Sequence, residues 1–232
     1  MAESADMAAP EPDTDAAYTE AVVDLLGVIA YGEISAFERL AEDAKLAPTI
    51  ADKLDIATMA SEQVAKVESL HQRIRALGAD PFEAMAPFRA PIEEFHRHTA
   101  PADWYEGLVK AYVGDGLAND FYREIAAYLD PETRDLVVRS MEEQHAAFVV
   151  DRVRAGIAED RRLGGRLALW GRRLMGEALT QAQRVAADRE SLSALLAGGI
   201  DRPGLDLAAL GRMFTRLTER HTARMGELGL DA

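Results

Sequence analysis

The chain has 232 residues, a formal net charge of −14 at pH 7 and no cysteine. The lack of cysteine excludes disulfides, thiolate zinc sites, iron–sulfur clusters and cysteine nucleophiles, and the acidic charge disfavours general attraction to nucleic acid or anionic membranes. This length accommodates one domain, or one domain with a helical annex.

The first segment, residues 1–16, is acidic and we expect it to be disordered. It lacks a basic residue and contains two prolines, Pro10 and Pro12. It shows neither the basic n-region nor the apolar run of a signal peptide, and no later stretch approaches the roughly 20 apolar residues of a membrane-spanning helix. We therefore expect a cytoplasmic protein that does not enter a membrane.

The rest of the chain has a helical pattern, because apolar residues recur at three- and four-residue spacing and Ala, Leu, Arg and Glu dominate. Helices are predicted near residues 17–46, 49–77, 102–129, 131–157, 162–197 and 205–228. The short connections predict two antiparallel pairs, joined by a long Pro-rich crossing at residues 79–101. This is an all-α, ferritin-like four-helix bundle over 17–157, with two additional C-terminal helices over 158–232 that form an annex packed on the core.

Polar residues interrupt the apolar stripes of three core helices. Glu33 falls in the middle of a stripe that contains Leu26, Ile29, Phe37 and Leu40. Asp115 lies at the centre of the stripe of the third helix, with Asn119 one turn later. The fourth helix carries Glu142 and His145 on its apolar face. These side chains are therefore expected to point into the bundle.

Their depths in the bundle agree, because residues that face each other across a helical hairpin have a nearly constant sum of residue numbers. By this measure Glu142 and His145 lie level with Asp115 and Asn119. Several buried carboxylates require a cation or a proton network. A Glu from each of two helices, together with Glu-x-x-His on the other two, forms a di-iron or di-manganese site.

The second helix permits two assignments. It contains a literal Glu68-x-x-His71 motif, which would complete the ligand set. The hairpin sum, however, places Glu33 opposite residues 62–63, about 9 Å from position 68 at 1.5 Å per residue. The residues at that level are Gln63 and Lys66, and Lys66 would supply positive charge in place of a metal.

The sequence resembles the actinobacterial ferritin-like proteins related to the MiaE-type tRNA hydroxylases. The likeness rests on Ala30-Tyr31-Gly32-Glu33, Ala36-Phe37-Glu38-Arg39-Leu40, Lys110-Ala111-Tyr112-Val113-Gly114-Asp115-Gly116 and Glu142-x-x-His145. It covers nearly the whole chain after the tail, whereas the likeness to characterised MiaE enzymes is confined to the bundle and the Glu-x-x-His motif. The resemblance implies a non-haem di-iron centre that activates dioxygen to hydroxylate a substrate, with Glu33, Asp115, Glu142 and His145 at ligand positions.

Two hypotheses follow. The first is an oxygen-dependent hydroxylase whose two iron or manganese ions are held by Glu33, Glu68, His71, Asp115, Glu142 and His145, with dioxygen and an unknown substrate as partners. A tRNA substrate is implied by the resemblance alone. The second is a metal-free ferritin-like scaffold or interaction protein with a degenerate metal site.

Three further expectations concern the surface. The last two helices offer apolar faces beyond what four helices need to cover, so we expect a homodimer. His96 and His98 lie in the Pro-rich crossing and are expected to be solvated. The arginines between Arg161 and Arg173 make the fifth helix locally basic, and pairing with the acidic excess is the preferred interpretation over RNA contact.

Overall fold

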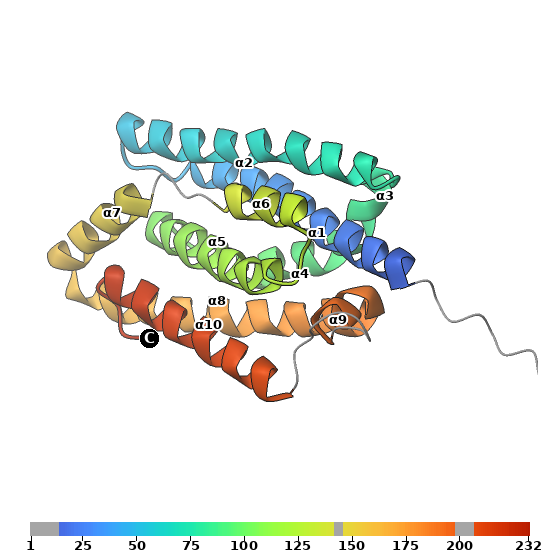
Figure 1. Ribbon diagram of the computed structural model, residues 1–232. Coiled ribbons are helices and arrows are strands. Elements are labelled where there is room, and N and C mark those ends of the chain that lie inside the picture. Colours follow the sequence, from blue (N-terminus) through green and yellow to red (C-terminus); the bar gives the residue numbers. More distant parts are fainter. Residues whose placement is uncertain (1–13, 142–145, 198–206) are drawn as a thin grey trace, which may run out of the picture.

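The computed structural model describes residues 14–141, 146–197 and 207–232, and these contain helices but no strand (Figure 1). The predicted acidic tail falls almost wholly outside them. The bundle consists of α1 (Thr14–Asp43), α2 (Ile50–Ala76), α5 (Trp104–Ala126), α6 (Pro131–Ser140) and α7 (Ala146–Glu159). The C-terminal part adds α8 (Arg161–Asp188), α9 (Glu190–Ala197) and α10 (Leu207–Glu227). The predicted all-α bundle is confirmed.

The crossing between the helix pairs is itself helical. Residues 79–101 contain α3 (Pro81–Met85), a 3-10 turn, η1 (Ala86–Phe88), and α4 (Arg89–His98). Asp80 caps α3, because its side chain accepts hydrogen bonds from the amides of Phe82 and Glu83. Pro81, Pro87 and Pro91 stand in first turns, where their missing N–H costs little, and Pro101 lies in the loop before α5.

Local signals set the helix ends. Thr49 caps α2 by accepting a hydrogen bond from the Asp52 amide at 3.1 Å, and Asp103 caps α5 in the same way from the Glu106 amide at 3.0 Å. Gly78 follows α2 with a φ of 82°, a backbone conformation that favours glycine. The helix predicted over 162–197 is divided at Arg189, which leaves helical geometry and donates from Nε to Asp24 at 3.0 Å.

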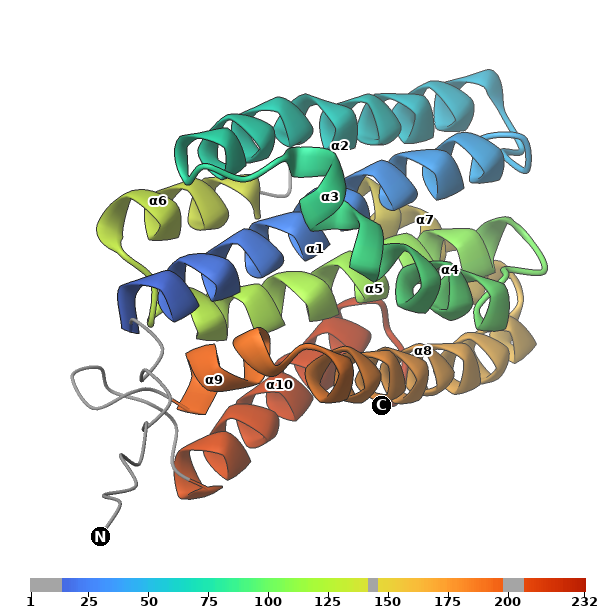
Figure 2. The ribbon, with the colours of Figure 1, turned by 90° about the vertical axis from the view of Figure 1, so that its right-hand side faces the viewer.

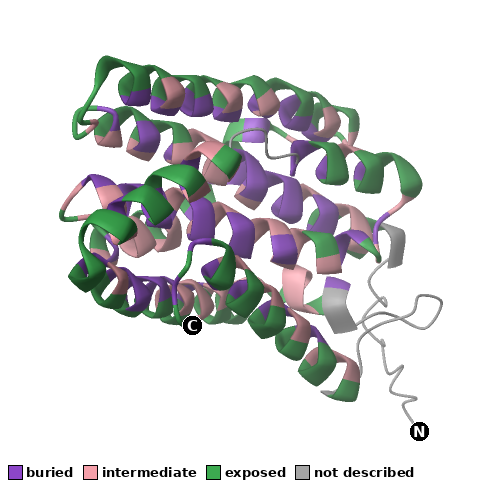
Figure 3. Cartoon of the chain, turned by 90° about the vertical axis from the view of Figure 1, so that its left-hand side faces the viewer, coloured by how far each residue is buried: buried purple, intermediate pink, exposed green. Residues whose placement is uncertain are grey.

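The helices pack in layers. In Figures 1 and 2, α1 lies along α2, while α8 and α10 pack against α5. Helix α4 contacts both α1 and α8, so the crossing covers the bundle on the side where α8 lies. Exposed residues follow the outer faces of the helices and buried residues the inner faces (Figure 3). None of the helices in the described residues is apolar over a length that could span a membrane.

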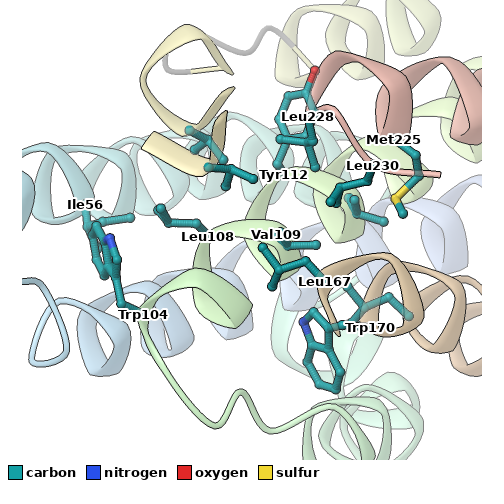
Figure 4. Packing of buried hydrophobic residues seen from close by; sticks show 14 of the residues in the cluster. Ile56, Trp104, Leu108, Val109, Tyr112, Leu167, Trp170, Met225, Leu228 and Leu230 are labelled. Atoms are coloured by element: carbon teal, nitrogen blue, oxygen red, sulfur yellow. The ribbon is translucent and has the colours of Figure 1, made fainter. Parts of the chain in front are cut away.

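Two hydrophobic clusters form the core. One contains Ile56, Trp104, Leu108, Leu167 and Met225 among others, and joins α2, α5, α8 and α10 (Figure 4). The second surrounds the early part of α1 and the end of α2. Burying one such side chain stabilises the fold by about 1.5–3 kcal/mol. Phe37 was predicted in the inward stripe of α1, yet it is 38% exposed, because it lies toward the edge of that stripe.

Candidate functional site

A cavity of about 220 Å³ lies inside the bundle, between the two clusters. Its lining comes from α1, α2, α4, α5 and α7. Apolar walls are interrupted by ionisable side chains, which are Glu33, Arg39, Asp43, Glu62, Lys66, His96, Lys110, Tyr112, Asp115 and Tyr122. A largely apolar cavity with a few converging polar groups is the usual form of a small-molecule site.

Helical periodicity brings these side chains together. On α1 the lining residues include Glu33, Ala36, Leu40 and Asp43, at spacings of three and four residues. Residues at such spacings lie above one another on one helix face. Glu33 and Asp43 are therefore nearly three turns apart on the same face, and they mark two ends of the cavity.

At one end, Lys66 bridges two side chains. Its Nζ lies 3.5 Å from Glu33 Oε2 and donates a hydrogen bond to Gln63 Oε1 at 3.0 Å. The Glu33 side chain is 12% exposed. Burial raises the pKa of Glu33 to about 7, an increase that nearby Asp115 adds to and Lys66 opposes. Burial and the charges of Glu33 and Asp115 also raise the pKa of Tyr122.

At the other end, Lys110 is 5% exposed and its Nζ has no hydrogen-bond partner among the described residues. Burial lowers its pKa to about 8, although Asp43 favours its charged form. Burial also raises the pKa of Asp43 to about 6. His96 completes this end: burial and then the charges of Lys110 and Arg39 lower its pKa to about 3, so it is neutral at pH 7.

The structure separates the predicted ligands. Glu33 and Asp115 both line the cavity. Glu68 instead lies on the surface, where it accepts a hydrogen bond from Gln72 at 3.2 Å and pairs with Arg75 at 3.4 Å. His71 is buried outside the cavity lining, with its ring 5.7 Å from that of Phe82.

Glu142 and His145 lie outside the described residues. The residue after them, Ala146, lines the cavity together with Val149. On α2, Gln63 and Lys66 lie at the same depth in the bundle as Glu33 of α1. This is the second of the two assignments that the sequence permits.

The described residues do not by themselves fit a two-metal centre. No group of three or more His, Asp or Glu side chains in this part of the chain is placed to hold a metal ion. A carboxylate-bridged pair of metals draws on six such ligands. Lys66 places an ammonium group beside Glu33 instead, and this cation satisfies the carboxylate that a metal would need.

Three cavity residues were missed or misjudged from sequence. His96 was expected to be solvated, but it lines the cavity and its Nδ1 is buried, because α4 turns that side chain toward α5. His98 is half-buried, with Nδ1 2.9 Å from Glu177 Oε1. Lys110 entered the sequence analysis only within the motif at residues 110–116, and Asp43 did not enter it. For Lys110 the available signal was the scarcity of lysine in the chain.

The basic stretch of α8 takes part in contacts within the protein. Arg166 pairs with Asp103 and, at 2.6 Å, with Glu106. Arg173 donates to the carbonyl oxygen of His98 at 2.5 Å. Arg166 thus balances acidic residues of the same chain, whereas Arg173 contacts a backbone carbonyl oxygen.

Comparison with known proteins supports the fold assignment. Residues 16–199 match the family model described as the ferritin-like domain of actinomycetes. No curated protein matches the chain.

Proposed function

Since the chain belongs to the family of ferritin-like domains of actinomycetes, we propose that it keeps the cavity of such a bundle to bind a small organic molecule, with an ion pair in place of the metal pair. One observation carries this proposal. Lys66 stands level with Glu33 and contacts both Glu33 and Gln63. A buried carboxylate needs a compensating charge, and here a side chain of the same protein provides it.

The composition of the cavity supports a small-molecule ligand. Ile29, Met59, Ile92 and Phe95 supply apolar surface, and the ionisable groups at each end can orient a ligand. In this proposal the main role of the protein is to bind a ligand. Any reaction would use the side chains of the cavity.

A second candidate is the oxygen-dependent hydroxylase that the MiaE resemblance implies, with iron as cofactor and tRNA or another substrate. One observation favours it: Ala146, which directly follows Glu142-Glu143-Gln144-His145, lines the same cavity as Glu33 and Asp115. Glu33, Asp115, Glu142 and His145 would be the metal ligands, and the metal would supply the activation of dioxygen.

Metal analysis separates the two candidates. The protein is purified after growth with added iron and manganese, and bound metal is measured by mass spectrometry. The first proposal predicts background metal in the wild type. The hydroxylase predicts about two metals per chain, lost in Glu33→Gln and retained in Glu38→Gln, an exposed control on the same helix. That second pattern would overturn the first proposal.

Ligand binding is tested by filling the cavity. Ala111 lines it from α5, and Ala111→Leu should reduce its volume with little loss of helix propensity. Small molecules that raise the Tm of the wild type should raise that of the variant much less. A screen in which every hit stabilises both proteins equally would contradict a ligand site in this cavity.

A further inference from the structure

Lysine is rare in this chain and concentrated at the cavity. Among 26 lysine and arginine residues the lysines are Lys45, Lys53, Lys66 and Lys110. Lys45 and Lys53 are exposed near the α1–α2 turn, whereas Lys66 and Lys110 line the cavity. Arginine stays charged when it is buried, but lysine can lose its proton. Two of the four lysines line the cavity, where a buried amine can lose its proton.

The two cavity lysines differ in their contacts. Lys66 is held by Glu33 and Gln63. Lys110 Nζ has no hydrogen-bond partner among the described residues and lies 5.7 Å from the centre of the Phe95 ring. A desolvated lysine beside another cation is the usual setting of a nucleophilic amine. Arg39 is that neighbouring cation, since its charge disfavours protonation of Lys110.

Asp43 provides a proton acceptor beside this amine. It lies against α5 at Gly107, where a Cβ atom would stand 3.1 Å from Asp43 Oδ2. Gly107 precedes Lys110 by three residues, so both positions share one helix face. The remaining charged or titratable groups that act on Lys110 or lie beside it are Arg39, Glu42, His96 and Asp115.

We propose that Lys110 is a nucleophile whose Nζ condenses with the carbonyl group of a small aldehyde or ketone bound in the cavity. This inference rests on the proposed small-molecule function and names its ligand class. The apolar body of the ligand packs against Phe95, Ile92 and Leu40. Arg39 Nε and His96 Nδ1, which also lack partners among the described residues, are available to the ligand's oxygen.

The reaction balances without an oxidant or reductant. The neutral Nζ adds to the carbonyl carbon, and its first proton passes through the Asp43 carboxylate to the carbonyl oxygen as the C–N bond forms. The second Nζ proton passes to the resulting hydroxyl group by the same carboxylate. The C–O bond then breaks, water leaves, and the C=N bond forms. An amine and a carbonyl compound thus become an imine and water.

The test is reductive trapping on the wild-type protein. Benzaldehyde and, separately, hexanal are added with sodium cyanoborohydride at pH 7, and the modified lysines are identified by peptide mapping. Lys110 should be labelled roughly tenfold or more faster than Lys45 and Lys53, whose amines are exposed to solvent and lie outside the cavity. Benzyl alcohol, which has the shape of benzaldehyde but no carbonyl, should slow labelling of Lys110 alone.

Variants give a matched control. Lys110→Met should lose this fast labelling, while Lys66→Met, the same change at the other end of the cavity, should keep it. Labelling that follows exposure, with Lys45 and Lys53 modified before Lys110, would overturn the inference. That result is distinct from failure of the proposed function, because metal content and cavity filling are measured independently of lysine chemistry.

Discussion

The two ends of the cavity contain the same elements but join them differently. Each has a lysine, a carboxylate of α1 and largely buried surroundings. At the first end, Lys66 contacts Glu33 and Gln63, so all three side chains are satisfied. At the second end, Lys110 Nζ and His96 Nδ1 have no hydrogen-bond partner among the described residues. The first end stabilises the bundle, whereas the second retains bonding capacity for a ligand.

This difference follows from helix register. Lys66 follows Gln63 by three residues on α2, so both side chains face Glu33 across the hairpin. Lys110 lies on α5 and reaches a region where α4 supplies Phe95 and His96. Asp43 favours the charged form of Lys110, but the aromatic ring and the neutral imidazole beside it replace little of the hydration that the ammonium group loses. The cost of that charge appears as the lowered pKa of Lys110.

The largest expected effect comes from converting the satisfied end into a metal site. Gln63→Glu with Lys66→His creates a Glu-x-x-His motif level with Glu33 and removes the competing ammonium. Bound iron or manganese should rise from background to at least one ion per chain, as metal analysis would show. The control is Lys110→His, which adds a histidine at the other end and should leave metal content unchanged. If the double variant bound no more metal than the wild type, the residues at positions 63 and 66 of α2 would not be what prevents metal binding.

Removal of each lysine should change stability in opposite directions. Lys66→Met leaves Glu33 buried without its cation, and we expect a loss of about 2–3 kcal/mol, because protonation of Glu33 relieves part of the cost. Lys110→Met removes a buried charge that lacks a hydrogen bond, and should raise the free energy of unfolding by about 1 kcal/mol. Urea unfolding at pH 7 measures both. Equal losses would mean that Lys110 has a compensating partner.

The pH dependence of stability should also differ between the ends. The folded-state pKa of Glu33 is about 7, above its ordinary 4.5. Between these values the folded protein holds a proton that the unfolded chain releases, so stability falls as pH rises from 4.5 to 7. The folded-state pKa of Lys110 is about 8, below 10.5. Between pH 8 and 10.5 the unfolded chain holds the extra proton, so stability rises with pH.

Variants isolate these two contributions. Glu33→Gln should remove a fall, and Lys110→Met a rise, each of about 3 kcal/mol across its window. The pKa of Asp43 changes from 3.8 to about 6 on folding and that of His96 from 6.5 to about 3, so both windows overlap that of Glu33. The quantity to compare is therefore the difference between wild type and variant at each pH. Chemical denaturation at closely spaced pH values provides it. If these differences changed with pH in the same direction in both windows, the attribution of the two contributions to Glu33 and Lys110 would be wrong.

The sequence was sufficient for the fold and for one wall of the site. Helical periodicity and short loops predicted the bundle, and the inward position of Glu33 and Asp115 followed from the same periodicity. The hairpin sum correctly placed Gln63 and Lys66 opposite Glu33, because an antiparallel helix pair with a short loop has little freedom in register.

The second end of the cavity, where Lys110 and His96 lie, could not be predicted in this way. His96 belongs to a Pro-rich crossing whose path depends on contacts of α4 with α1 and α8, and these are long-range contacts. Lys110 reaches the cavity with a long side chain, so the position of its Cα on the helical wheel says little about where Nζ lies. The helical period does not predict where the end of such a long side chain lies. Several groups around Lys110, among them Phe95, Asp43 and Arg39, come from other helices.

The smallest expected effect concerns the Glu68-x-x-His71 motif of α2, which lies away from both ends of the cavity. Glu68 is 64% exposed and Arg75 50% exposed, and their ion pair is screened by water. Glu68→Ala should therefore change the free energy of unfolding by no more than about 0.5 kcal/mol, and it should leave metal content and Lys110 labelling as in the wild type. Glu33→Ala, the same substitution inside the cavity, should alter stability and its pH dependence together. If Glu68→Ala changed metal content while Glu33→Ala did not, the chemistry of this bundle would belong to residues 68–71 and the cavity comparison would fail.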